Sequence, residues 1–82
     1  MYQFYTVEIK KNSAGEFEHD INWFWDESET KAQLKGEAKF HEILSRAATS
    51  TYTEHAAILF SSKGNRIMDK CYYHTAEVMD NA

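Results

Sequence analysis

The four histidines and one cysteine of this 82-residue chain are the residues best able to bind a metal or to take part in catalysis. Imidazole nitrogens and a thiolate are the usual ligands of zinc, and His19, His41, His55, His74 and Cys71 would suffice for a tetrahedral site. Their spacing argues against one, because no pair has the C-x₂-C or H-x₃-H separation of zinc ligands. Cys71 and His74 would also point to opposite faces of a predicted strand. We therefore expect no metal site and no cofactor.

The same cysteine would be a nucleophile if the fold placed His55 or His41 beside it, since catalytic partners need not be adjacent in sequence. Cys71 lies within an alternation of apolar residues, however, and a thiol buried among such residues is unreactive. Carboxylates cluster around Glu18, on a strand face that we expect to be solvated. They also cluster around Glu27, where negative charge complements a helix dipole. We predict that the chain is not an enzyme.

Aromatic side chains are the remaining candidates for a site. In Trp23-Phe24-Trp25, alternation sends both indoles to one side of a strand and Phe24 to the other. The indoles are expected to anchor the helix, but Trp25 becomes an interface hot spot if it lies at the sheet edge. A small-ligand pocket between two copies of the chain would be lined by Trp25, Tyr52 or Tyr73.

Hydrophobic periodicity predicts the elements that must position these residues. Alternating apolar side chains predict strands over residues 5–10 and 16–25, with a turn at Gly15, and over 55–60 and 66–75, with a turn at Gly64. A helix is predicted to begin near Asp26 or Ser28, either of which could cap it, and to end near Ala48. Gly36 lies mid-helix, where it either allows close approach to the sheet or is simply tolerated.

The element order β-β-α-β-β predicts an α+β fold, a four-stranded antiparallel sheet with one helix packed on one face. Short connections favour the spatial order second, first, third, fourth strand, with second, first, fourth, third as the main alternative. We expect one domain over residues 1–75 and a frayed tail over residues 76–82.

Both faces of the predicted sheet carry apolar side chains, more than one helix can cover. The expected helix stripe includes Leu34, Ala38, His41 and Leu44 and widens toward Ala48. The face that we expect it to cover includes Val7, Ile9, Ile21, Trp23, Ile58, Phe60, Ile67 and Cys71. The residues then left exposed, which predict a partner interface, are Phe4, Phe24, Leu59, Met68 and Tyr72. The alternative is that polar side chains and loops cover this second face.

Composition limits the partners. With nine basic and thirteen acidic residues the formal charge is −4, and the absence of a basic stripe predicts no direct contact with nucleic acid. The longest apolar run, Ala56 to Phe60, is too short to cross a membrane, and the pattern of the first residues predicts no signal peptide. A cytoplasmic protein is the expectation.

Short segments spread over residues 4–75 resemble one group of proteins. The segments are Tyr5-Thr-Val-Glu-Ile9 with Gly15, Glu37-Ala-Lys-Phe-His41 with Leu44, Ala47, Ala48 and Ser50, His55-Ala-Ala, Gly64, and Cys71-Tyr72-x-His74. They resemble small uncharacterised proteins of phages, prophages and mobile elements of gut Firmicutes, which often have Lys-Tyr-His where this chain has Lys39-Phe40-His41. The resemblance implies a phage or mobile-element setting inside bacteria, and it carries no activity or catalytic residue.

Together these features predict a non-enzymatic accessory protein that self-associates, most simply as a dimer, and binds or blocks a host or phage protein. Inhibition of bacterial antiviral defence is one version, in which an acidic surface occupies a basic groove. Two alternatives stay open: a structural part of a virion or tail assembly, and a small-ligand sponge for a nucleotide.

Overall fold

The structure, a computed structural model, describes residues 1–74. The predicted tail (76–82) and Thr75, the expected end of the last strand, lie outside the described residues. The elements are β1 (Tyr2–Lys11), β2 (Phe17–Asp26), α1 (Glu29–Ala47), β3 (Glu54–Ser61) and β4 (Arg66–Tyr73).

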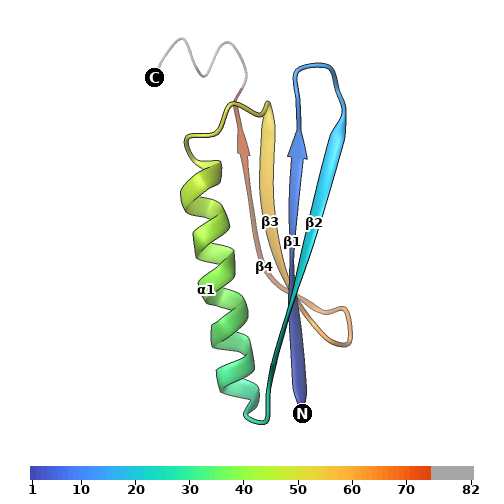
Figure 1. Cartoon of the computed structure of the whole chain (residues 1–82), viewed down its shortest axis with the longest axis vertical. Helices are drawn as coiled ribbons and strands as arrows, with labels where there is room; N and C mark the ends of the chain where they lie inside the picture. Colours follow the sequence, from blue (N-terminus) through green and yellow to red (C-terminus); the bar gives the residue numbers. More distant parts are fainter. Residues whose placement is uncertain (75–82) are drawn as a thin grey trace.

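The α+β fold and the favoured strand order are confirmed. The four strands form one antiparallel sheet in the order β2-β1-β3-β4. Strands β2 and β3 therefore flank β1 and run parallel to each other, and α1 makes the connection between them. Figure 1 shows α1 lying lengthwise along one face of the sheet. Within residues 1–74, no element lies on the opposite face.

Local chemistry explains where the elements begin and end. Both predicted helix-start residues take part: Ser28 is the N-cap, its Oγ accepting from Lys31 N–H, while Asp26 Oδ1 accepts from Ser28 N–H at 2.9 Å. The two hairpin loops contain Gly15 and Gly64 at φ of +85° and +83°, a conformation that glycine adopts at little cost.

Helix α1 packs closely on the sheet because its buried stripe contains small residues. The stripe is Ala32, Gly36, Phe40, Ile43 and Ala47. The prediction was wrong in the N-terminal half of the helix, where Leu34 is 56% exposed and Ala38 is also exposed. His41 is exposed as well. A Cβ on Gly36 would lie 2.6 Å from Leu59 Cδ1, so this glycine permits the close approach.

The predicted assignment of sheet faces was also wrong for β1, β2 and β3, because α1 covers the other set of their side chains. On β4, Ile67 packs on the core as predicted. On the central strands the covered residues are Phe4, Thr6 and Glu8 of β1 and His55, Ala57 and Leu59 of β3. Glu8 and His55 are polar, and their burial is tolerable because they hydrogen-bond to each other and to Arg46 and Ser50. The more apolar alternation of the strands, including Ile21 and Trp23, is the one left uncovered.

Candidate functional site

The surface opposite α1 is the most distinctive feature of the molecule, and we call it the open face. The strand register places on it the alternate residues of each strand, which share one side of the pleated sheet. Its apolar and aromatic members are Tyr5, Val7, Ile9, Phe17, Ile21, Trp23, Trp25, Ala56, Ile58, Phe60, Cys71 and Tyr73, and His19 lies among them.

These side chains form a continuous surface across the strands. In one cross-strand row Tyr5 lies between Trp23 and Phe60. The centroid of the Tyr5 ring is 4.6 Å from that of Trp23 and 4.9 Å from that of Phe60. In the next row Val7 lies between Ile21 and Ile58. Ile21 is 56% exposed and Trp23 and Trp25 are each 47% exposed, so the apolar area faces solvent. Contiguous patches of this kind mark interaction sites.

The open face carries almost no net charge. At one end Lys11 pairs with Glu54 at 3.4 Å, and at the β4 edge Arg66 pairs with Asp69 at 3.1 Å. These charges therefore neutralise each other at the rim. The acidic excess of the chain lies elsewhere; on the other side of β2, for example, Glu18 and Asp20 face Lys10.

The interface residues predicted from sequence lie on the covered side instead. Phe4 and Leu59 are 5% and 0% exposed beneath α1, so neither is available to a partner. Phe24 pairs across the sheet with Phe4, and Met68 pairs with Leu59 and packs on the core. Tyr72 lies opposite buried His55, on the same side. The exposure predicted for Phe4 and Leu59 was therefore wrong, and Phe24, Met68 and Tyr72 are half-buried on the same side.

The three predicted ligand or hot-spot residues do not meet. Trp25 and Tyr73 lie at opposite ends of the open face, opposite Gln3 and Glu54 respectively. Tyr52 lies in the loop before β3, where its ring contacts His55 edge-on and its hydroxyl donates to Glu18. Within one copy they form no shared pocket among the described residues.

Sequence reasoning missed a buried polar cluster on the covered face. The Glu8 and His55 side chains are 5% and 3% exposed, and His55 Nε2 lies 2.5 Å from Glu8 Oε2. The Arg46 guanidinium donates to both Glu8 oxygens at 3.1 Å and 3.3 Å, and Ser50 Oγ lies 2.9 Å from His55 Nδ1. Burial would raise the pKa of Glu8, but hydrogen bonds and charge from His55 and Arg46 outweigh it and lower the pKa.

The connectivity Ser50–His55–Glu8 matches that of a nucleophile, a base and an orienting carboxylate. Its surroundings do not suit acyl transfer. Ser50 follows the C-terminal end of α1, where the helix dipole is negative and opposes a developing oxyanion. The Ser50 N–H already donates to Ala47 O. We assign this cluster a structural role: it joins the end of α1 to the centre of the sheet.

Cys71 and His55 do not form a Cys–His pair. Cys71 is half-buried on the open face opposite Ala56, whereas the His55 ring lies on the covered face. His74 Nε2 donates to Ala47 O at 2.8 Å. In the part of the chain that the structure describes, no three histidine, cysteine or carboxylate side chains are grouped to hold a metal ion.

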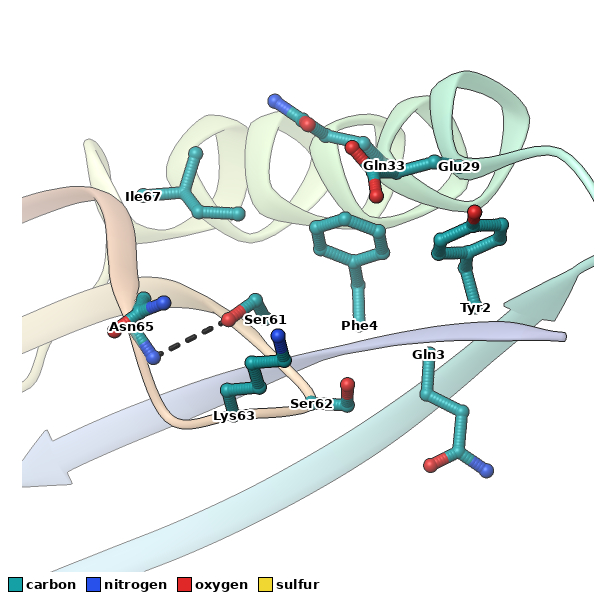
Figure 2. Close-up of a pocket in the computed structure, with 10 residues that line it drawn as sticks. All are labelled: Tyr2, Gln3, Phe4, Glu29, Gln33, Ser61, Ser62, Lys63, Asn65 and Ile67. Atoms are coloured by element: carbon teal, nitrogen blue, oxygen red, sulfur yellow. Dashed lines mark hydrogen bonds between the residues drawn. The ribbon is translucent and has the colours of Figure 1, made fainter.

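A cavity of about 370 Å³ lies where the first turn of α1, the start of β1 and the β3–β4 loop meet. Figure 2 shows the rings of Tyr2 and Phe4 pointing toward α1, with Glu29 and Gln33 above them and Lys63 across the opening. Lys63 is the only cation among the lining residues, whereas binding of a nucleotide phosphate usually involves several basic side chains or backbone N–H groups. None of Trp25, Tyr52 and Tyr73 lines it.

Comparison with known proteins returned no family model, curated protein or solved structure that matches this chain significantly. No helix among residues 1–74 is long and apolar enough to cross a membrane. Fold and surface thus define the class directly: a two-layer α+β protein with one sheet face uncovered.

Proposed function

We propose that this chain is a non-enzymatic binding protein whose working surface is the open face. Following the resemblance noted above, its setting is a phage or mobile element in a bacterial cytoplasm. There it associates with itself and binds or blocks a host protein, with inhibition of antiviral defence as one outcome. The observation that carries the proposal is the exposure of Ile21, Trp23 and Trp25 on one continuous surface.

A partner that covers the open face would gain hydrophobic free energy. Full burial of a large apolar side chain stabilises by roughly 1.5–3 kcal/mol, and Ile21, Trp23 and Trp25, which are about half exposed, each forgo about half of that. Monomeric proteins seldom keep several such residues adjacent without a partner to cover them. Tryptophan and tyrosine, which line the aromatic end of this face, are also the residues enriched among interface hot spots.

The charge distribution bears on whether an acidic surface of this chain could occupy a basic groove of a host protein. A basic groove would be met by an acidic surface, but the charges beside the open face are paired, as in Lys11–Glu54. An apolar partner surface therefore suits the open face. A basic partner would instead use surfaces outside it, such as the covered side of β2 around Glu18 and Asp20.

A photo-crosslinking pair tests the working surface in bacterial cells. Benzoylphenylalanine replaces Ile21 on the open face or Leu34 on the outer side of α1; both side chains are 56% exposed. We expect position 21 to form covalent adducts with a second copy of the chain or with a host protein, identified by mass spectrometry, and position 34 to form few. Adding Trp23→Lys should abolish the adducts from position 21. Equal yields from the two positions would refute the proposal. Adducts formed only with virion proteins in purified particles would indicate a structural role instead.

A further inference from the structure

We infer that a second copy of this chain covers the open face, stacked sheet on sheet about a two-fold axis that crosses the strands. The inference rests on the proposed function and specifies the partner of the same surface. In the resulting dimer the two sheets form the inner layers and the two α1 helices lie outside. Three features of the open face favour this occupant: its area, its charge and its distribution of side-chain sizes.

The area is suitable. Four strands about 4.8 Å apart and eight residues long at about 3.4 Å each give a face of about 19 Å by 27 Å, or roughly 500 Å² in projection. The accessible area over the side chains is larger than the projection. Two stacked copies therefore cover at least about 1,000 Å² in total, the lower limit expected of a specific interface.

The charge is suitable as well. Two copies that carry the same net charge repel each other unless the facing surfaces are neutral or self-complementary. On the open face the rim pairs Lys11–Glu54 and Arg66–Asp69 cancel within each copy, while the centre around Val7 and Ile58 is apolar. Asp69 lies in the same row as Ile58, so it would meet Asp69 of the other copy as half of a neutral pair with Arg66. The formal charge of −4 is therefore displaced from this surface onto the rest of the molecule.

The sizes of the side chains select the axis. One end of the open face is bulky, with Trp23, Tyr5 and Phe60 in a row. Two rows away toward the other end, the central strands carry only Ile9 and Ala56. On the two central strands, an axis that crosses the strands places Tyr5 and Phe60 of one copy over Ile9 and Ala56 of the other. Close packing of the two layers requires such complementarity.

This axis makes a positional prediction. The axis lies over the middle cross-strand row, which contains Ile21, Val7 and Ile58. Ile21 on β2 of one copy therefore faces Ile21 of the other across about 10 Å, the usual separation of stacked sheets. Phe17 lies four residues along the same strand and face, about 14 Å from the axis, so its two copies are roughly 27 Å apart. Phe17 and Ile21 are 57% and 56% exposed, which makes them a matched pair.

The purified chain provides the test. Sedimentation of the wild type at roughly 10 μM should show a dimer, and Ile21→Lys should weaken dimerisation by roughly 100-fold because it places an unpaired charge in the contact. Leu34→Lys, on the outer side of α1, should leave the dimer intact. Far-ultraviolet circular dichroism of each variant checks that it still folds.

Crosslinking then tests the axis. In a Cys71→Ser background, Ile21→Cys should be linked efficiently by a short bis-maleimide and Phe17→Cys should not. A dimer that links at Phe17→Cys rather than Ile21→Cys would show that the proposed axis is wrong. A dimer that persists in Ile21→Lys would show that the open face is not the interface and would indicate another surface, such as the free edge of β2. A wild-type monomer overturns the second-copy inference and the self-association part of the proposed function. Binding to a host protein survives that result if position 21 still crosslinks to a host protein in cells.

Discussion

Thr6 lies in the middle of β1, and its side chain is fully buried on the covered face. Within residues 1–74, its hydroxyl is a buried side-chain oxygen without a hydrogen-bond partner. A buried unpaired hydroxyl costs free energy relative to a methyl group of the same shape. We therefore expect Thr6→Val to raise the free energy of unfolding by about 1 kcal/mol, measured by urea denaturation.

A second threonine provides a control of opposite sign. Thr53 Oγ1 donates to Lys11 O at 2.9 Å, where it links the loop before β3 to the end of β1. Thr53→Val leaves that carbonyl with one fewer donor and should lower stability by about 1 kcal/mol. If both valine variants shift stability in the same direction, strand propensity rather than hydroxyl pairing governs the Thr6 site.

Glu8 is the titrating centre of the buried polar cluster. Because its pKa in the folded protein is lowered below the ordinary value of 4.5, ionised Glu8 stabilises the fold above pH 4.5. That contribution is lost as the pH falls through the lower folded-state pKa. Glu8→Gln should therefore lose about 2 kcal/mol at neutral pH, and the gap to wild type should narrow as the pH falls below 4.5.

Denaturation of both proteins at a series of pH values measures that gap. Glu18→Gln on β2 is the control, since the Glu18 side chain is 59% exposed and its ion pair with Lys10 contributes less than about 0.5 kcal/mol. A gap between wild type and Glu8→Gln that stays constant down to strongly acidic pH would mean that the Glu8 charge does not stabilise the fold.

At the scale of elements, the contact between α1 and β3 depends on the absence of a side chain at Gly36. Alanine there would improve helix propensity by about 1 kcal/mol, but its Cβ would meet fully buried Leu59 at 2.6 Å. Because overpacking typically costs about 1–3 kcal/mol, we expect Gly36→Ala to destabilise the protein by about 1 kcal/mol.

A double-mutant cycle separates the two effects. Leu59→Val removes the Cδ1 atom that the added Cβ would meet, so in that background Gly36→Ala should be neutral or stabilising. Ala38→Gly, at an exposed position of α1, calibrates propensity alone. If Gly36→Ala destabilises both backgrounds equally, the close approach to Leu59 is not the reason for the glycine.

At the scale of the whole molecule, sequence periodicity and short connections were enough to predict the strand order. The sheet faces were not predictable in this way, because both alternations of β1 are apolar in part: Phe4 on one side, Val7 and Ile9 on the other. The deciding contacts are tertiary. Glu8 and His55 are buried because Arg46 and Ser50, from the end of α1 and the loop beyond it, supply their partners.

The phase of the helix was missed for a related reason. Hydrophobic size favoured Leu34, whereas the buried side of α1 carries the small residues Ala32 and Gly36, and Gly36 lies against Leu59. The surplus of apolar surface was visible in the sequence, since it follows from counting apolar positions on both faces. Its location was not, because the covered side is held by a polar network as well as by hydrocarbon.

The two tryptophans of the chain, Trp23 and Trp25, both lie on the open face and are each about half exposed. Indole emission moves to shorter wavelength when water is displaced from the ring. The intrinsic fluorescence of the unlabelled protein therefore reports chiefly on this one surface. Dilution or titration of the native chain can follow the filling of that surface without any attached dye.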